Sequence, residues 1–450
     1  MRKFFLPVFL LISCHLFAQP FILRQDALED IDSMNMRIRE VHYNPFLYIS
    51  EKKFNSFTDS VKASIPDSIS KQDFIIKLYA VLSLMNDAHS YPAISQTALR
   101  NDLINPVFFP AEFLIDDENK VFIRNVKSDS LQKATQVDFI NGIDLKKFAF
   151  ETLGYFGGLP QFRKEMRQRL FSYLLYLKGL RPPFEIRSGK KNDITIHKGI
   201  KFFDALSLSL PQLSKGAYEF RMLGKNAGYL DFISMSGSIE DFYGYMDSVM
   251  RIMRKNEIPN FIVDLRNNSG GNSALADLLV SFISTKPYSL MGKRYWKISQ
   301  SYKNYQAGNQ SMSAYLDKEV GHTWQRGDCK PESHKFNIDS VYTGKVYFIT
   351  GPFTFSSANM LADGVKTYKL GKIIGTKTGE ATNDFGEVYS FKLSKSGIII
   401  NTTTAFDIGA SCKEEVMEAV DPDILIQTSV QQMLQDVDPV LEYVKNEIKN

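Results

Sequence analysis

Three short stretches of the sequence carry groups that could perform chemistry together. The stretch TFSSAN at 354–359 places two adjacent serines where a strand-like run gives way to a helical one. The stretch DLRNNSGG at 264–271 ends an apolar run with two glycines, and NDAHSYP at 86–92 carries His89. A hydroxyl, an imidazole and free backbone N–H groups are the parts of an acyl-transfer site. Their function depends on whether the fold brings them together.

Each stretch also has a purely structural interpretation. A serine before a helix is a common N-cap, although the same position offers free N–H groups and a positive dipole end that suit a developing oxyanion. Two glycines after a strand make a tight turn, or let backbone N–H groups approach a substrate closely. A lone histidine usually has a structural or surface role; His89 stands out because it lies between polar neighbours where a helical region ends.

The elements that must position these groups fall into three regions. Residues 20–96 have apolar positions at helical spacing. Residues 105–212 contain short β-like runs, with a helical insert at 162–180. From about residue 216 onward strands and helices alternate, which favours an α/β core with a mixed sheet.

Two details of the core can be predicted. The runs VYSFKL (388–393) and GIIINTTTAF (397–406) are expected to pair as an antiparallel hairpin. The segment 296–340 is polar and aromatic without a clear period, so we expect a surface excursion that borders a binding site. The sequence therefore predicts an α/β (α+β) multidomain protein, with a signal peptide at 1–18, a helical domain at 19–97, a small β domain at 98–213 and the core at 214–450.

The N-terminus predicts export. Basic residues precede the short apolar run FFLPVFLLI at 4–12, and Ala18 offers a small residue for cleavage. LISC at 11–14 resembles a lipobox, in which Cys14 would be lipidated, but the apolar run continues to Phe17 and we favour cleavage after Ala18. No other run of 18 apolar residues occurs, so no spanning helix is expected. We expect the protein in the periplasm, the cell envelope or outside the cell.

Composition excludes several function classes. The formal net charge of +4 is small for 450 residues, and no RNP, helix-turn-helix or zinc-finger pattern occurs, so a nucleic-acid partner is not expected. No Cys and His spacing fits a zinc site, and neither a metal nor another cofactor is predicted. A disulfide between Cys329 and Cys412 is allowed, but spacing alone does not establish it.

The ordered stretches resemble the S41 family of serine peptidases, which includes the C-terminal processing (tail-specific) proteases and a tricorn-like branch. The resemblance covers most of 216–426 and implies a ClpP/crotonase-like peptidase core acting on a peptide or protein substrate. Its motifs stand in the family's order: DLRNNSGG (264–271), TFSSAN (354–359), IIGTKT (373–378) and AVDPDI (419–424).

The resemblance implies a role for each site residue. Ser356 matches the family's nucleophile. Ser357 would cap the helix and donate one oxyanion hydrogen bond through its backbone N–H, and Gly270 or Gly271 would supply the other. The resemblance thus assigns the nucleophile to Ser356 and the helix cap to the adjacent Ser357.

The general base separates the two branches of the family. The processing proteases use a Lys about two dozen residues after the Ser, a position that falls near Ala381 here, and Lys377 lies on the wrong side of it. The tricorn-like branch uses a His in a D-x-H-[ST] pattern, which Asp87-Ala-His89-Ser90 matches. A Glu shortly before the P-D-I close orients that His; the nearest match is Glu415, with Glu414 and Glu418 not excluded. That branch has a Ser where this chain has Ala88, and whether Ser90 substitutes stays open.

The middle region resembles, through QVDFINGIDLKKF (136–148), the PDZ-like module of these proteases, which binds chain termini by strand addition. A generic small β domain is the alternative. We therefore predict a secreted Ser-His-Glu peptidase. The alternatives are a Ser-Lys processing protease, an esterase with the same oxyanion apparatus, and a non-catalytic peptide-binding protein on the same fold.

Overall fold

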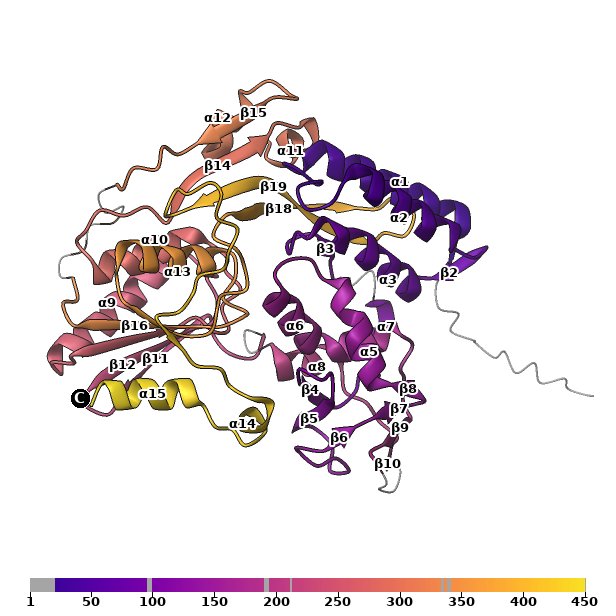
Figure 1. Cartoon of the computed structure of the whole chain (residues 1–450), viewed down its shortest axis with the longest axis horizontal. Helices are drawn as coiled ribbons and strands as arrows, with labels where there is room; N and C mark the ends of the chain where they lie inside the picture. Colours follow the sequence, from indigo (N-terminus) through magenta and orange to yellow (C-terminus); the bar gives the residue numbers. More distant parts are fainter. Residues whose placement is uncertain are drawn as a thin grey trace, which may run out of the picture.

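The computed structural model describes residues 21–94, 99–189, 194–210, 213–332, 336, 338 and 341–449. The predicted signal peptide and Cys14 lie outside these residues. Within them, no helix has both the length and the apolar character needed to cross a bilayer. Figure 1 shows an α/β core on one side of the molecule, with the N-terminal helices and the middle region on the other. The α/β multidomain architecture predicted from the sequence is confirmed.

The N-terminal region is helical, as expected. Its helices begin at sites that the sequence marks: the Ser50 and Ser70 hydroxyls accept the backbone N–H groups three residues ahead. A short antiparallel pair, β1 with β2, ties its start to the turn before α3. The elements are β1 (Phe21–Leu23), α1 (Arg24–Val41), α2 (Glu51–Ala63), β2 (Ser68–Ser70), α3 (Lys71–Leu82), η1 (Ser83–Met85) and β3 (Tyr91–Pro92).

The middle region combines two small antiparallel sheets with helices. One sheet has the order β4-β5-β6 and the other β10-β9-β7-β8. The helical insert expected at 162–180 forms two helices that meet at Leu170. The elements are β4 (Ala111–Ile115), β5 (Val121–Val126), β6 (Gln136–Val137), β7 (Phe139–Ile140), β8 (Ile143–Asp144), α5 (Leu145–Glu151), η3 (Thr152–Tyr155), α6 (Pro160–Arg169), α7 (Phe171–Leu177), β9 (Phe184–Arg187), β10 (Ile194–Ile196) and α8 (Phe202–Ser209).

The core is a mixed sheet with the order β11-β12-β13-β16-β17-β20. Its first pair is antiparallel and the other pairs are parallel. The carboxyl ends of β13 and β16 are neighbours, so the loops carrying DLRNNSGG and TFSSAN leave the same edge of the sheet. The strands are β11 (Tyr218–Leu223), β12 (Ala227–Phe232), β13 (Asn260–Asp264), β16 (Lys345–Thr350), β17 (Lys372–Gly375) and β20 (Ile424–Leu425).

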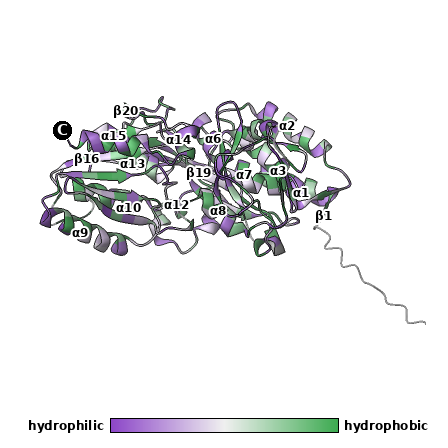
Figure 2. Ribbon diagram, turned by 90° about the horizontal axis from the view of Figure 1, so that it is seen from below, coloured by the Kyte–Doolittle hydropathy of each residue, from purple (hydrophilic) through white to green (hydrophobic). Residues whose placement is uncertain are grey.

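Helices cover both faces of this sheet. On one face α9 (Ile239–Lys255), α10 (Ser273–Ile283) and α13 (Ser357–Tyr368) pack over a large apolar cluster. On the other face α15 (Pro439–Glu447) packs through Val440 and Val444, and α14 (Val430–Leu434) precedes it. In Figure 2 the strands near β16 are largely green, whereas α9 carries both colours along its length. Continuous apolar strands are typical of a sheet buried on both faces.

A second sheet extends from the core toward the N-terminal helices. The predicted hairpin is confirmed: β18 (Asp384–Lys392) pairs antiparallel with β19 (Ile399–Gly409). Part of the segment expected to be an irregular excursion is ordered instead, because β14 (Met291–Lys297) pairs with β19 and β15 (Thr323–Arg326) pairs with β14. The same segment contains α11 (Gln300–Tyr305), η5 (Gln310–Met312) and α12 (Ser313–Leu316).

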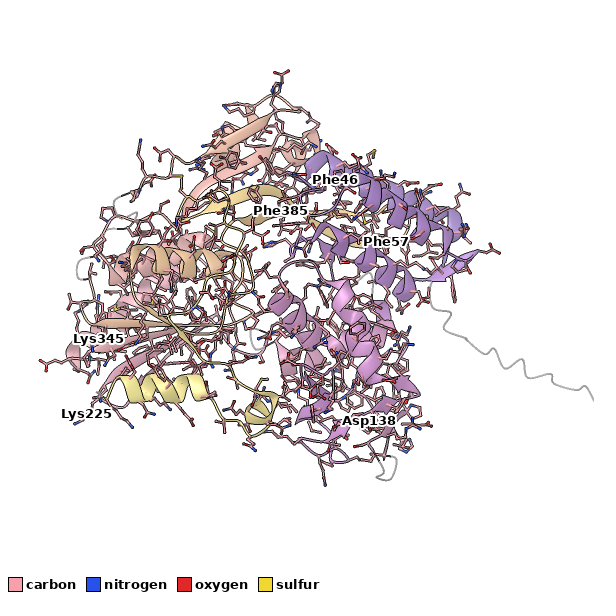
Figure 3. All side chains as sticks on the ribbon, viewed as in Figure 1. Phe46, Phe57, Asp138, Lys225, Lys345 and Phe385 are labelled. Carbon is pink, nitrogen blue, oxygen red and sulfur yellow. A yellow bond between two sulfur atoms is a disulfide. The ribbon has the colours of Figure 1, made fainter. Side chains whose placement is uncertain are left out.

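A disulfide and two packing contacts hold these regions together. Cys329 and Cys412 form a disulfide, with Cα atoms 5.9 Å apart, that fixes the segment after β15 to the end of β19. Phe385 of β18 packs edge-on against His42 at the end of α1, with ring centroids 4.4 Å apart; Figure 3 labels this phenylalanine between the hairpin and the helices. One continuous apolar cluster also joins the N-terminal helices to the middle region and reaches Phe355 next to the predicted nucleophile.

Candidate active site

Ser356 stands at the sharp turn between the loop after β16 and α13. Its backbone has φ 52° and ψ −127°, a region that a residue with a Cβ rarely adopts. Strain of this kind persists where surrounding structure enforces it, often at functional sites. The Ser356 side chain makes no capping hydrogen bond, and it lines a cavity. The interpretation of this serine as a simple N-cap therefore fails.

The loop that carries Ser356 is bonded to the end of β13. Thr354 Oγ1 donates to the Leu265 carbonyl over 2.8 Å, and the Phe355 N–H donates to the Asn268 carbonyl over 3.1 Å. The Asn268 amide in turn donates to the Phe232 carbonyl over 2.7 Å. These bonds explain why a Thr two residues before the Ser and an Asn before the glycines belong to the pattern: they hold two loops in one geometry.

The glycine turn leaves one of its amides free at the cavity. The Gly270 N–H donates to Asn268 Oδ1 over 2.8 Å, so this donor is already occupied. Gly271 lines the cavity, and among the described residues no protein acceptor takes its N–H or that of Ser357. Ser357 is the first residue of α13, and its hydroxyl donates to the Gly271 carbonyl over 2.8 Å. The expectation that Ser357 caps the helix is therefore wrong; its side chain fixes the glycine turn.

Close packing explains the glycine beside the serine. A Cβ built on Gly270, whose φ is +94°, would lie 2.8 Å from Ser356 Cβ and 2.8 Å from the Ser357 nitrogen. Real Cβ atoms do not approach other atoms so closely, and the neighbours here are backbone and the predicted nucleophile. Any side chain at position 270 must displace the nucleophile loop.

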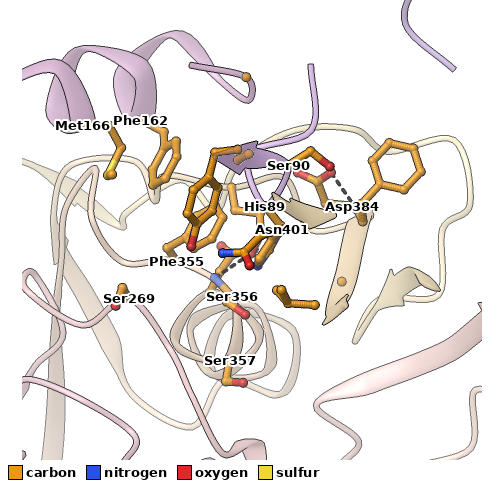
Figure 4. Close-up of a pocket in the computed structure, with 18 of the residues that line it drawn as sticks. His89, Ser90, Phe162, Met166, Ser269, Phe355, Ser356, Ser357, Asp384 and Asn401 are labelled. Carbon is orange, nitrogen blue, oxygen red and sulfur yellow. Dashed lines mark hydrogen bonds and ion pairs between the residues drawn. The ribbon is translucent and has the colours of Figure 1, made fainter. Parts of the chain in front are cut away.

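His89 is brought to the core by a short strand that follows it. β3 pairs antiparallel with β19, with Tyr91 opposite Asn401, and the Ala93 N–H donates to the Ile399 carbonyl over 2.8 Å. The N-terminal helical region thus places the His89 imidazole in the same cavity that Ser356 lines. Figure 4 shows His89 above the tip of the helix that carries Ser356 and Ser357. The described structure contains no hydrogen bond between the imidazole and the Ser356 hydroxyl.

Asp87 fixes the turn in which His89 stands. One carboxylate oxygen accepts the His89 N–H over 2.8 Å, and the other accepts Thr403 Oγ1 of β19 over 2.9 Å and faces His42 Nε2 at 3.2 Å. Burial alone would raise the pKa of Asp87, but the hydrogen bond and charge of His42 outweigh it and lower the pKa to about 2. The Ser90 hydroxyl also donates to this carboxylate, so Ser90 stabilises the turn.

The carboxylate at the imidazole is Glu380, which the sequence reasoning missed. Glu380 Oε1 lies 3.4 Å from His89 Nδ1, and Oε2 accepts the Ser356 N–H over 2.6 Å. Glu415, the expected partner, is exposed in the segment after β19. The correction has a physical reason. The chain between β17 and β18 runs directly beside the helix tip, where Asn359 of α13 donates to the Ala381 carbonyl over 2.8 Å.

The other candidates for the base or its partner lie elsewhere. Glu414 pairs with Lys293 at the surface, and Glu418 is exposed. Lys377 pairs with Asp421 over 3.0 Å, with both side chains more than half exposed. Ala381 lines the cavity at the position expected for a catalytic Lys. The described structure therefore contains the imidazole arrangement rather than a Ser-Lys pair.

Burial sets the charge states of the groups around Ser356. It lowers the pKa of His89 below its usual 6.5, so the imidazole is neutral and able to accept a proton at neutral pH. Burial, together with the nearby charge of Asp384, raises the pKa of Glu380 well above 4.5. Burial and the charge of Asp87 raise the pKa of Asp384 to about 8. A proton held on Asp384 relieves the second of these effects on Glu380, whereas burial, the larger effect, still raises its pKa.

The cavity that contains these groups has a volume of about 780 Å³, which suits a ligand of the size of a short peptide segment. One wall is apolar and comes largely from the helical insert and the nucleophile loop, where Phe162 stacks on Phe355 with centroids 4.3 Å apart. The opposite wall comes from β18 and β19 and carries carboxylates. No group of three or more potential metal-ligating side chains occurs among the described residues.

Comparison with known proteins identifies the core. Residues 226–426 match the family model described as Peptidase family S41. This part of the chain, a little less than half of it, therefore resembles peptidase family S41. The S41 core spans the glycine turn, Ser356 and Glu380, whereas His89 lies outside the matched residues. The match supports a serine-type peptidase.

The fold of the chain is also similar to solved structures over nearly its whole length. Mature CPAF complexed with lactacystin superposes with a TM-score of 0.63 at 15% identity, covering 95% of this chain and 98% of that one. The crystal structure of mature CPAF gives a TM-score of 0.60 at 15% identity, covering 95% of this chain and 97% of that one. No curated protein sequence matches the chain. The similarity extends to the N-terminal and middle regions, which the family model does not cover.

Proposed function

We propose that the chain is an S41 peptidase that hydrolyses peptide bonds through Ser356, His89 and Glu380. The observation that carries the proposal is Glu380, because one carboxylate contacts both the Ser356 backbone and the His89 ring. A base that is oriented by a carboxylate and lines the same cavity as a strained serine is the arrangement of nucleophilic catalysis.

The chemistry follows from these positions. Ser356 Oγ attacks the carbonyl carbon of the scissile bond while its proton passes to the free ring nitrogen of His89. Glu380 holds the proton on Nδ1 and stabilises the imidazolium that forms. The proton then goes to the leaving amine, the C–N bond breaks, and a water molecule, deprotonated by the same ring, releases the acyl group from Ser356. Closure of the cavity on substrate would shorten the His89 to Ser356 separation, since catalytic hydrogen bonds are often loose in free enzymes.

The oxyanion of the tetrahedral intermediate would be bound by backbone N–H groups. The Ser357 and Gly271 amides are the donors that we assign, because no acceptor among the described residues takes either N–H. The Gly270 amide does not fit the role, since Asn268 Oδ1 already accepts it. Loss of one such donor typically costs about 10²–10³-fold in kcat.

The experiment compares digestion of an unfolded protein substrate by the wild-type chain and by Ser356→Ala and His89→Ala variants, with products identified by mass spectrometry. We expect cleavage by the wild type and a loss of at least about 10³-fold in each variant. A Lys377→Ala variant serves as the matched control for the Ser-Lys alternative and should retain activity. Full cleavage by Ser356→Ala would overturn the proposal.

Export and the domain roles remain proposals beside this function. We propose that the chain acts in an oxidising compartment, which the Cys329–Cys412 disulfide supports, since such bonds are rare in the cytosol. We propose that the middle region, residues 98–213, is a PDZ-like module with a helical insert. It lies between a helical domain at 19–97 and the core at 214–450.

A further inference from the structure

Two carboxylates that line the cavity, Asp384 and Glu387, have no ion-pair partner among the described residues, and Glu387 accepts a hydrogen bond from the Trp296 indole instead. Asp407 forms a two-pronged ion pair with Arg294, with contacts of 2.5 and 2.6 Å, and Asp87 faces His42. Asp384 lies opposite Asp407 on the paired strands and lines the cavity. No described Lys, Arg or His lies within ion-pair distance of Asp384, and its Oδ1 accepts the N–H of Phe385 over 2.7 Å. The wall formed by β18 and β19, called here the acidic wall, thus contains a carboxyl group, Asp384, without a counter-ion near the nucleophile.

A second group in the same cavity also lacks a donor. Asn359 is 3% exposed, and its side-chain N–H₂ group is fixed by the hydrogen bond to the Ala381 carbonyl. Its Oδ1 atom has no hydrogen-bond partner among the described residues, although the residue lines the cavity. A buried acceptor without a donor is destabilising. Asn359 therefore favours, independently of the acidic wall, a ligand that brings N–H groups.

We propose that the acidic wall binds a cationic group of the peptide substrate, with Asp384 as its ion-pair partner and Asn359 Oδ1 as an additional acceptor. The cation is either a Lys or Arg side chain or the free α-amino group of the peptide. This inference rests on the proposed peptidase function and assigns its substrate class. The facing wall is apolar, with Phe162, Met166 and Leu170 among its residues, so a charged group is directed to the β18 side.

Binding of the cation is coupled to a proton. Since the pKa of Asp384 is raised to about 8, its carboxyl is largely neutral at pH 7 when the cavity is empty. A cation that pairs with it displaces the proton, so the affinity for cationic substrates rises as the pH approaches about 8. The groups that face Asp384 from the surrounding elements are Glu380, Asp87, His89, Asp407, Arg294 and Tyr48.

The test uses the full chain and matched peptide pairs. In each pair one position carries either lysine or norleucine, which has a similar length and no charge, and each peptide is made with a free and with an acetylated N-terminus. We measure kcat/KM for the wild type, Asp384→Asn, Asp384→Glu, and Glu240→Gln as a control that removes one exposed charge in the first turn of α9. Circular dichroism and thermal melting verify that each variant is folded.

We expect the wild type to prefer the lysine peptide, or the free amine, by about tenfold or more, as for a charged pair with little solvent access. The preference should disappear in Asp384→Asn, persist in Asp384→Glu and Glu240→Gln, and increase between pH 6 and pH 8. A preference for lysine over norleucine identifies a side chain as the cation, and a preference for the free over the acetylated N-terminus identifies the α-amino group. Equal cleavage of all peptides by a wild type that is labelled at Ser356 by a phosphonate would overturn this inference alone. A protein that neither reacts with the phosphonate nor cleaves peptides would overturn the proposed function as well.

Discussion

Replacing Glu380 by glutamine tests the assignment of the orienting carboxylate. The change keeps the shape of the side chain and removes its charge. The glutamine can still accept the Ser356 N–H through its oxygen, as Glu380 does over 2.6 Å, but it then turns an N–H₂ group toward His89 Nδ1. That contact favours the tautomer with its proton on Nε2, and a ring in that state cannot take a proton from the serine.

The size of the effect follows from the lost interaction. A hydrogen bond to a charged group contributes about 1.5–3 kcal/mol, and each 1.36 kcal/mol is a factor of ten in rate. We therefore expect kcat for Glu380→Gln to fall between about tenfold and about 150-fold, with a smaller change in KM because the interaction strengthens when the imidazolium forms.

The assay is steady-state hydrolysis of a fluorogenic peptide, with Glu415→Gln as the matched control. Glu415 is exposed, and its replacement should change kcat less than about twofold, as for most surface substitutions. Unchanged kcat in Glu380→Gln together with a tenfold loss in Glu415→Gln would refute the reasoning and restore the expectation from the sequence.

Three further changes have defined outcomes. Gly270→Ala should reduce kcat/KM by about 10²-fold, because its Cβ would displace the Ser356 loop. The control Gly154→Ala, whose Cβ meets no atom within 4 Å, should remain active. Equal activity of the two variants would contradict the close packing at Gly270. The acid limb of the kcat/KM profile should have its midpoint below 6.5, since burial lowers the pKa of the base His89; a midpoint above 7 would exclude this ring in its assigned role. Asp363→Asn should raise the melting temperature at pH 8 but not at pH 4. Burial raises the pKa of Asp363 from 3.8 to about 6, so its ionised form lowers the free energy of unfolding by up to about 3 kcal/mol above that pH. Equal melting temperatures of the wild type and Asp363→Asn at pH 8 would show that ionised Asp363 does not destabilise the fold.

Local patterns in the sequence predicted most of the fold. The alternating core, the β18–β19 hairpin and the helical front have strong periodicity, because each packs one face or one stripe against a large apolar cluster. The ordering of the segment 296–340 is not predicted from the sequence, because β14 pairs with β19, more than 80 residues away in sequence, and β15 pairs with β14. No local signal reports such pairing.

The residues of the candidate site also differ in whether a local motif predicts them. Ser356, the glycine turn and His89 lie in short motifs with recognisable residue types, and the structure brings them to one cavity. Glu380 could not be selected, because its approach to His89 depends on how the N-terminal region docks on β19 through β3. One signal was present: Glu380 lies at the slot where the related proteases place their basic residue, and a carboxylate at that slot requires its cation from elsewhere in the chain.

The central claim is that Ser356 is a nucleophile activated by His89, and the rate of its labelling by a phosphonate tests it most directly. We predict a single adduct on the peptide that contains Ser356, lost in Ser356→Ala and formed at least about 10²-fold more slowly in His89→Ala. An adduct that still forms in Ser356→Ala, or that forms at the wild-type rate in His89→Ala, would contradict the account.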